Sequence, residues 1–393
     1  MAGVAAALAQ WASSFEPAEE DLALADRALR DTVAVAYAAR EHPLRHLFGH
    51  LSEAGGQAAL AHVLDFDDLH LPSTTHISAV CVPAALASDG GARAYLAGAG
   101  VIARLGTALG WRHYTAGWHA TCTAGAPAAA VAAGIANGLD AEATATAIAL
   151  AIPGAGGVQR AFGTASKSLQ VGFAVDAGLR AAELARAGAS ADPLALEQWL
   201  DLVGGNSGDQ HIDGPAVPGG IAMKLYPCCY ALQRPIAATA QLPEISPDEI
   251  RLVRVRTPAD SLTPLIHGRP NTGLEAKFSL EYGVAATLLD GLPGLETFTD
   301  EAVQRLEARR LMELVEVIPA GGGHGLLDGD ISIELTLRDG ETTSVGLKSP
   351  PGAPDRPPSD VEIGEKLERC AGRRAAEIQE LDWGTAAAFL RAL

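Results

Sequence analysis

One short segment of this chain carries several reactive side chains around a proline. The segment is Lys224-Leu-Tyr-Pro-Cys-Cys-Tyr-Ala-Leu-Gln-Arg, with an amine, two thiols, phenols and a guanidinium, in a chain otherwise rich in alanine and glycine. Taken alone, it is also compatible with the start of a helix that has Pro227 in its first turn. Because reactive groups are scarce elsewhere, we interpret Lys224 as part of a candidate site, and expect Cys228 and Cys229 to serve in packing.

A second segment combines carboxylates with histidines. Asp65-Phe-Asp-Asp-Leu-His-Leu-Pro-Ser-Thr-Thr-His76 holds three aspartates and two histidines. Such oxygen and imidazole groups can bind a divalent metal. Alternatively, Asp67 and Asp68 cap a helix while His76 satisfies backbone groups. We favour an acid–base or substrate-orienting role for this segment over a metal site, and predict no metal.

Two further segments have small residues next to groups that suit an anion. In Gly117-Trp-His-Ala-Thr-Cys-Thr-Ala-Gly-Ala126, open backbone N–H groups at a helix start suit a carboxylate beside His119, although a plain histidine in a tight turn fits equally. In the segment 159–172, Arg160 and Lys167 can clamp a carboxylate, and a solvated helix start is the alternative. Lys167 does not follow glycine in the spacing of a nucleotide-binding loop.

The composition limits the possible partners. The 29 basic and 47 acidic side chains give a formal charge of −18, which disfavours nucleic acid and anionic membranes. Five cysteines without a C-x-x-C pair argue against a disulfide framework and a four-ligand zinc site. The N-terminal segment lacks the basic residues of a signal peptide, and no apolar run reaches the roughly 20 residues of a membrane span. We therefore expect a cytoplasmic protein.

The elements that must position these groups fall into two classes. From Ala23 to about Leu202, apolar residues recur at helical spacing, with Asp140 as a predicted N-cap and a helix from Ala174 that stops at Gly188. After residue 220, the segments 251–256, 314–318, 331–337 and 342–347 are predicted strands, the last two joined by a hairpin turn. A proline-rich linker at 350–358 then precedes a helical C-terminus.

These segments, in this order, resemble the MmgE/PrpD family, which includes 2-methylcitrate dehydratases, cis-aconitate decarboxylases and an iminodisuccinate epimerase. The resemblance spans nearly the whole chain. The matching pieces are Asp65-Phe-Asp-Asp with Ser73-Thr-Thr-His76 and Pro83-Ala-Ala-Leu-Ala, Gly117-Trp-His-Ala-Thr121, Lys167-Ser-Leu-Gln-Val-Gly172, Lys224-Leu-Tyr-Pro227, and Glu275-Ala-Lys-Phe-Ser-Leu-Glu-Tyr282.

The resemblance implies a mainly α fold with two domains. A large all-helical domain is expected from residues 1–219 and 352–393, with a smaller inserted α+β lid domain at 220–351. It further implies a homodimer formed through the helical domain, and an active site between the two domains without metal or organic cofactor. The composition changes near residues 220 and 350 agree with these boundaries.

The resemblance also assigns the site residues. The residues that look catalytic are Asp65, His76, His119, Lys167, Lys224 and Tyr282, and those that look substrate-binding are Thr121, Arg160, Gln170 and Lys277. In three places the chain departs from many members. Leu69 stands where they have threonine, Gln170 where they have histidine, and Cys229 or Gln233 where a histidine follows the Lys-x-Tyr-Pro turn.

The expected chemistry is proton abstraction next to a carboxylate of a small di- or tricarboxylate. Lysines would stabilise the developing enolate, while His119 and His76 move protons and Asp65 fixes an imidazole tautomer. A dehydratase is the favoured reading. An epimerase or isomerase of an amino- or imino-dicarboxylate, and a decarboxylase of the cis-aconitate type, are the alternatives. A carboxylate-binding protein without catalysis is a further possibility, because Leu69 and Gln170 remove two polar groups.

Overall fold

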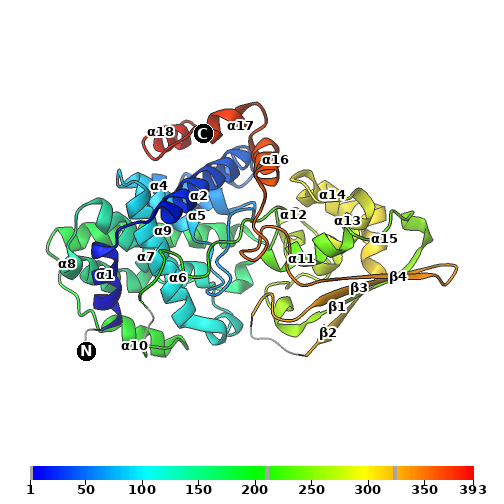
Figure 1. Ribbon diagram of the computed structural model, residues 1–393, viewed down its shortest axis with the longest axis horizontal. Coiled ribbons are helices and arrows are strands. Elements are labelled where there is room, and N and C mark those ends of the chain that lie inside the picture. Colours follow the sequence, from blue (N-terminus) through cyan, green and yellow to red (C-terminus); the bar gives the residue numbers. More distant parts are fainter. Residues whose placement is uncertain (1–2, 209–211, 322–324) are drawn as a thin grey trace.

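The computed structural model describes residues 3–208, 212–321 and 325–393. The apolar N-terminal segment is also predicted to form the first helix, and its first two residues, Met1 and Ala2, lie outside the described residues. The first half of the chain is helical and occupies one end of the molecule (Figure 1). Its helices are α1 (Val4–Ser14), α2 (Glu19–Ala38), α3 (Arg45–Phe48), α4 (Glu53–His62), α5 (Ser78–Ala87), α6 (Ala92–Thr115), α7 (Ala120–Ala136), α8 (Ala141–Ala151), α9 (Ala165–Arg186) and α10 (Ala195–Leu202).

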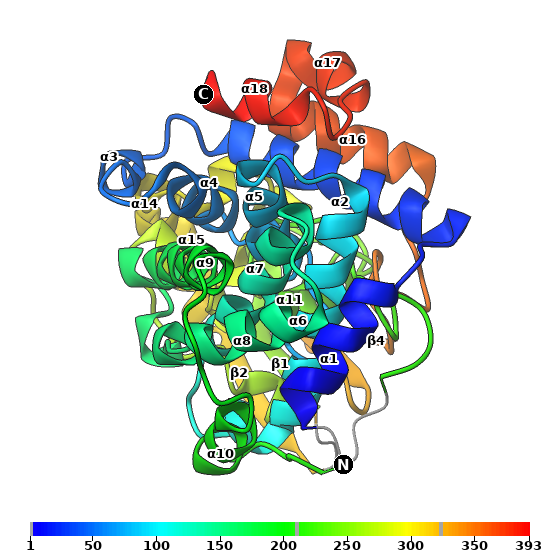
Figure 2. The same cartoon turned by 90° about the vertical axis from the view of Figure 1, so that its left-hand side faces the viewer.

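Helix α7 lies between α6 and α9 (Figure 2), and small residues allow this close approach. A Cβ atom on Gly178 of α9 would lie 2.5 Å from the carbonyl oxygen of Ala126. One on Gly98 of α6 would lie 2.9 Å from the Cβ of Ala132. Since real contacts of a Cβ are longer, alanine and glycine in these helices are required by the short distance between helix axes.

Local signals for helix ends are confirmed at α8 and partly at α9. The Asp140 side chain accepts a hydrogen bond of 2.9 Å from the Ala143 N–H and so caps α8 as predicted. Helix α9 ends before Gly188, which has φ +87°, but it begins at Ala165, much earlier than the predicted start at Ala174. Lys167 therefore lies in the first turn of a long helix.

The second part of the chain, at the other end of the molecule, contains a mixed sheet of four strands (Figure 1). The strands are β1 (Ile250–Pro258), β2 (Val315–Ala320), β3 (Ile331–Leu337) and β4 (Thr342–Leu347), in the order β2-β1-β3-β4. Strands β1 and β2 are parallel, with Val253 opposite Val315, whereas β3 is antiparallel to both β1 and β4. All four predicted strands are confirmed, and so is the hairpin between β3 and β4.

Short helices accompany this sheet. They are α11 (Tyr230–Thr239), α12 (Gly273–Ala276), α13 (Leu280–Asp290), α14 (Asp300–Gln304) and α15 (Leu306–Glu313). Among them, α11, α13 and α15 pack against the strands of the sheet. The tail forms α16 (Asp360–Ala371), α17 (Ala375–Gln379) and α18 (Ala386–Arg391), which lie along α2 (Figure 1). The 3₁₀ turns are Ile152–Gly154, Gln159–Ala161, Pro247–Glu249, Ala259–Leu262, Glu296–Phe298 and Gly372–Arg374.

Two hydrophobic cores follow from this arrangement. One joins the helices of the first half to the tail, through residues such as Leu367, Ile378 and Phe389. The other lies under the sheet and reaches Leu69 and Phe162 of the first half. The prediction of a mainly α protein is confirmed, while the exact domain limits and the lid role of 220–351 stay predictions. Among the described residues, no helix has the length and hydropathy needed to cross a membrane.

Candidate active site

The loop between α4 and α5 is held at its centre by two lysines from distant parts of the chain. The carbonyl oxygen of Asp65 accepts a hydrogen bond of 2.9 Å from Lys224 Nζ, and that of Phe66 accepts one of 2.9 Å from Lys366 Nζ. Asp65 has φ +51°, a conformation that costs a non-glycine residue energy. The strained turn sends the carboxylates of Asp65 and Asp67 into a common buried cluster.

Asp65 is the anionic centre of that cluster. Its Oδ1 lies 2.6 Å from Lys224 Nζ, 3.4 Å from Lys167 Nζ and 3.7 Å from His76 Nε2. Burial acts to raise the pKa of Asp65, but the two lysines outweigh it and hold the pKa well below its usual range. The pKa of Lys224, which burial acts to lower, is in turn raised by Asp65. Both groups are therefore charged at neutral pH.

Asp67 lies between two imidazoles. Its Oδ2 is 2.7 Å from His62 Nδ1, a hydrogen bond, and 3.0 Å from His76 Nδ1, which lies off the direction of a well-formed bond. Burial lowers the pKa of His76 to about 3 and also lowers the pKa of His62, in spite of the nearby carboxylate. At neutral pH, both histidines are therefore uncharged.

His62, Asp67 and His76 offer three possible metal-ligand atoms within 4.8 Å of one another. Two observations oppose a resident metal ion. The His62 and Asp67 atoms are already joined by a hydrogen bond, and Lys167 Nζ lies 2.5 Å from the other nitrogen of His62. A divalent cation here would have to separate hydrogen-bonded partners beside the ammonium groups of Lys167 and Lys224. The donor set is better explained as a hydrogen-bond network, and we assign no metal site to it.

His119, the N-cap residue of α7, is the third imidazole beside the cluster. Its backbone N–H donates to Gly157 O at 3.0 Å, and its Nδ1 lies 3.2 Å from Cys122 Sγ. Its Nε2 is buried and has no hydrogen-bond partner among the described residues. Burial, together with Lys167, lowers the pKa of His119 well below its usual value. A neutral imidazole with a free nitrogen is thus held beside the cluster, with its ring centroid 5.8 Å from that of His62.

Lysines and aromatic rings close the cluster. Lys167 Nζ lies 5.5 Å from the ring centroids of both Phe162 and Phe278, within the range of a cation–π contact. Lys277 Nζ donates to Pro227 O at 2.6 Å, and burial lowers the pKa of Lys277 to about 8. Between these groups lies a cavity of about 10 Å³. Its lining includes His62, Asp65, Lys167, Lys277 and Phe278. The space suffices for about one water molecule.

The structure brings together seven of the ten residues predicted for the site: Asp65, His76, Thr121, His119, Lys167, Lys224 and Lys277. Of these, Thr121 acts on the backbone, since its Oγ1 accepts a hydrogen bond of 3.0 Å from the His76 N–H. The other six place an ionisable side chain in or next to the cluster.

Three predicted residues lie elsewhere. The Tyr282 hydroxyl donates to Thr297 O at 2.5 Å, and its ring packs against Phe298. Arg160 is exposed to solvent. Gln170 accepts from the Val158 N–H at 2.9 Å and donates to Ser166 Oγ at 3.2 Å, so both ends of its amide support the turn before α9. In this conformation none of the three faces the cavity.

Comparison with known proteins gives the family. A family model described as the MmgE/PrpD N-terminal domain matches residues 53–200, and the MmgE/PrpD C-terminal domain matches residues 226–388. This chain belongs to the MmgE/PrpD family. The predicted resemblance is confirmed.

Two relatives are cis-aconitate decarboxylases. One from Aspergillus terreus is 26% identical over 388 aligned residues, which cover 86% of this chain and 78% of the relative. The other, from Aspergillus terreus strain NIH 2624 / FGSC A1156, is 25% identical over 384 aligned residues, covering 85% of this chain and 78% of the relative.

The departures of this MmgE/PrpD chain from many family members have structural counterparts. Leu69 pairs through its backbone with Ala222 and belongs to the core under the sheet. Gln233 accepts from the N–H groups of Leu225 and Tyr226, each at 3.1 Å, and so braces the turn that carries Lys224. The thiol of Cys229 is buried, and its pKa, raised by burial and then by Asp65, is about 12. It is therefore an uncharged group beside the cluster.

Sequence reasoning did not select His62, although it contacts both Asp67 and Lys167. The only signal was a histidine at the end of an otherwise apolar helix. Phe162 and Cys122, which lie against His119, were also missed, and Asp67 was singled out by itself as a helix cap, although its segment was given an acid–base or substrate-orienting role. These residues lie in or next to the motifs that carry the family resemblance. Nothing in the sequence around them indicates that their side chains belong to a site.

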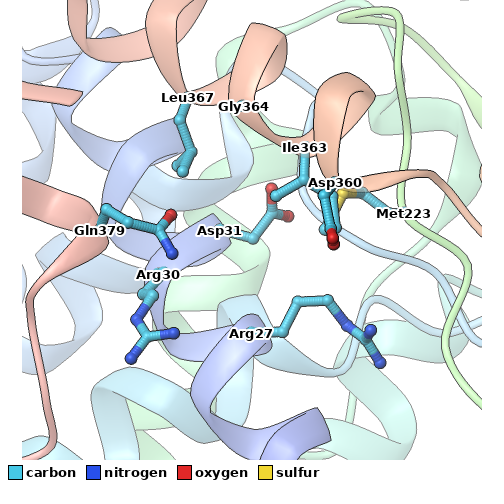
Figure 3. A pocket seen from close by; sticks show the side chains of 9 residues that line it. All are labelled: Arg27, Arg30, Asp31, Met223, Asp360, Ile363, Gly364, Leu367 and Gln379. Carbon is cyan, nitrogen blue, oxygen red and sulfur yellow. The ribbon is translucent and has the colours of Figure 1, made fainter. Parts of the chain in front are cut away.

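A much larger cavity of this MmgE/PrpD chain, about 460 Å³, lies between α2, α16 and α17. Its lining residues are Arg27, Arg30, Asp31, Met223, Asp360, Ile363, Gly364, Leu367 and Gln379. Figure 3 shows the guanidinium groups of Arg27 and Arg30 turned away from each other on α2, rather than converging on one point. Without converging polar groups, this cavity lacks the arrangement expected of an active site.

Proposed function

We propose that this chain is a cofactor-independent lyase that removes a proton next to a carboxylate of a small di- or tricarboxylate, with loss of water as its reaction. The observation that carries the proposal is the free Nε2 of a neutral, buried His119 beside lysine ammonium groups. A C–H bond next to a carboxylate is only weakly acidic. Its ionisation needs both a base and positive charge at the carboxylate. This cluster supplies the two together.

The proposed sequence of steps uses only side chains of the cluster. The substrate carboxylate binds between Lys167 and Lys277, and His119 Nε2 takes the proton from the adjacent carbon. The electron pair passes into the carboxylate as an enolate, which the ammonium groups stabilise in a site from which water is excluded. The pair then forms the carbon–carbon double bond while the β-hydroxyl leaves. His119 returns its proton to the departing hydroxyl, so that water is released and the neutral imidazole is restored.

Substrate entry requires the cluster to open. A cavity of about 10 Å³ cannot hold a dicarboxylate, since sites for small molecules usually measure about 300–1,000 Å³. One wall of the cavity comes from Gly163 and Thr164, before α9, and the facing wall from Leu274, Lys277 and Phe278. We infer that the unit 220–351 acts as a lid that moves these two walls apart, and that it closes over the bound carboxylate.

Decarboxylation is the second candidate, because both relatives bear the name cis-aconitate decarboxylase. In that reaction the bond to the carboxyl carbon breaks, carbon dioxide leaves, and the remaining electron pair is delocalised as before. The enzyme then supplies a proton to carbon instead of removing one. The same lysines would bind the carboxylates, but the proton donor would have to be a protonated group, and burial keeps the histidines of the cluster neutral at neutral pH.

The test is to incubate the purified protein in D₂O with a panel of C4 to C7 di- and tricarboxylates, with and without a β-hydroxyl. We expect a β-hydroxy acid to be converted to the unsaturated acid, as followed by absorbance and NMR spectroscopy. Release of carbon dioxide with one deuterium on the product carbon would instead select decarboxylation. Binding of panel members without conversion or exchange of any C–H bond would contradict both and leave a carboxylate-binding protein.

A further inference from the structure

The ammonium group of Lys167 makes its shortest polar contact with a residue that has no role in the steps above. Lys167 Nζ lies 2.5 Å from His62 Nε2. His62 is the last residue of α4 and Lys167 lies in the first turn of α9, two helices that pack together. Both side chains are buried. The contact is therefore fixed by the packing of two helices.

The hydrogen bond on the other side of the ring determines which nitrogen of His62 carries the proton. Asp67 is a carboxylate and can only accept, so His62 Nδ1, at 2.7 Å, must donate to it. The imidazole is neutral, because burial lowers its pKa and Lys167 lowers it further. Its Nε2 consequently carries a lone pair, and the 2.5 Å contact is a hydrogen bond donated by Lys167.

This arrangement accounts for the donors of Lys167. An ammonium group has three N–H bonds. One donates to His62 Nε2 and a second points to Asp65 Oδ1 at 3.4 Å, while the rings of Phe162 and Phe278 flank the amine at 5.5 Å. Lys167 is also one of the residues that line the small cavity. The third N–H bond is thus left for a group that enters that cavity.

We propose that Asp67 and His62 position Lys167 for a substrate carboxylate, Asp67 by fixing the tautomer of His62 and His62 by accepting one N–H of the ammonium group. His62 is a positioning residue in this scheme and does not itself transfer a proton to the substrate. The inference rests on the proposed function, because it takes a carboxylate as the ligand of the third N–H. In this role, His62 can be replaced by any side chain that places a hydrogen-bond acceptor at the same distance from Lys167.

Two substitutions of His62 test this directly. In His62→Gln, the amide oxygen can replace Nε2 as the acceptor for Lys167, whereas His62→Met has similar size and no comparable acceptor. We expect His62→Gln to keep KM and kcat within about threefold of wild type. His62→Met should raise KM at least about tenfold, as for the loss of one hydrogen bond to a charged group, with the pH profile of kcat unchanged. Thermal unfolding of both variants is the check on folding.

Two outcomes would overturn the proposal. Equal loss of kcat in His62→Gln and His62→Met, with an altered pH profile, would mean that the imidazole itself carries protons. Unchanged kinetics in both variants would mean that the contact with Lys167 does not matter for binding.

A measurement without turnover separates this inference from the proposed function. In the ¹⁵N NMR spectrum of histidine-labelled protein, with His62→Gln used for assignment, we expect wild-type His62 to be protonated at Nδ1 and not at Nε2. In Asp67→Asn, the amide can either accept from or donate to Nδ1, so this position no longer enforces one tautomer, and a fraction of His62 should become protonated at Nε2. If wild-type His62 shows a protonated Nε2, the tautomer argument is wrong even if the enzyme is active. If the Nδ1–H form is found but no panel compound reacts, the proposed function fails and the positioning of Lys167 stands.

Discussion

The molecule contains two buried lysine–carboxylate pairs that have similar geometry but different surroundings. Lys224 and Asp65 lie 2.6 Å apart, as do Lys366 and Asp31. Each lysine also donates to a backbone carbonyl of the same loop, at Asp65 and Phe66 respectively. Yet the pKa of Asp65 lies well below its usual range, whereas the pKa of Asp31 is raised, because burial outweighs the effect of Lys366 and Asp67 adds repulsion.

The difference lies in what surrounds each pair. Around Asp65 there are further lysines and neutral histidines, and four buried atoms have no hydrogen-bond partner in the described part of the chain: Asp65 Oδ2, Asp67 Oδ1, His76 Nδ1 and His119 Nε2. Asp31 and Lys366 leave no such buried atom within the described ranges, although the larger cavity borders Asp31. A buried ion pair is therefore a weak sign of function, and unpartnered polar atoms beside it are a stronger one.

The strongest test of this distinction is to replace His119, the proposed base beside the Lys224–Asp65 pair. His119→Gln keeps the approximate size of the side chain but cannot take up a proton, and should lower kcat/KM by about 10²–10⁴-fold. Its free energy of unfolding should change little, because Nε2 has no partner among the described residues. Steady-state kinetics on the substrate found in the D₂O panel, together with urea denaturation, would measure both quantities.

His113 provides the matched control. It is also a buried histidine, but both of its nitrogens are bonded, Nδ1 to Val203 O at 2.8 Å and Nε2 to Thr123 Oγ1 at 2.9 Å. His113→Gln should therefore destabilise the protein while leaving kcat within a few-fold of wild type. Comparable activity losses in the two variants would show that satisfied and unpartnered histidines are not functionally distinct here.

The second test concerns the pair that we regard as structural. Lys366→Met leaves the carboxylate of Asp31 buried without its cation, which should reduce the free energy of unfolding by about 3–5 kcal/mol. The double variant Asp31→Asn/Lys366→Met should recover a large part of that loss, since no buried charge remains. Urea denaturation of the wild type and the variants measures both effects. A large fall in kcat at unchanged stability would place Lys366 in the catalytic machinery instead.

The parts of the fold that depend on nearby residues were predictable from the sequence. The cap at Asp140 and the alternation in Ile331–Leu337 each require only a few neighbouring residues. The parallel pairing of β1 with β2 joins residues 62 positions apart, such as Arg254 and Glu316, and no local pattern contains it. The early start of α9 was missed because its first turns combine glycine with polar residues, which resemble a loop.

The part of the site that could be predicted consists of residues that lie in a motif and whose type alone suggests chemistry. The sequence singled out lysines and histidines in an alanine-rich chain, and the structure places several of them in one buried cluster. His62 was missed because its role depends on Asp67, five residues later, and on Lys167, which is 105 residues away. Gln170 and Tyr282 illustrate the opposite case, in which a polar group that suggests a site instead bonds to a neighbouring segment. Motif position identifies candidates, and only the fold decides where their side chains point.

The smallest expected effect concerns a third buried lysine, Lys277, and the pH dependence of kcat/KM. Lys277 differs from Lys224 and Lys366 in having no carboxylate within ion-pair distance in the described part of the chain, and burial lowers its pKa to about 8. If its ammonium form binds the substrate carboxylate, kcat/KM of the wild type should fall above about pH 8. The fall should total about tenfold to a hundredfold, because a hydrogen bond to a charged group is worth about 1.5–3 kcal/mol.

Two variants of Lys277, together with the pH dependence of stability, show whether Lys277 is the group that titrates. Lys277→Arg stays charged up to about pH 12 and should lack the decline near pH 8, whereas Lys277→Met should have a low kcat/KM at every pH. Between a pKa of about 8 in the folded state and 10.5 for an ordinary lysine, the unfolded chain binds more protons. The contribution of Lys277 to stability therefore rises with pH over this interval, while activity falls. A decline near pH 8 that persists in Lys277→Arg would have to come from another group, and the lysine without a carboxylate partner would then have no special part in binding.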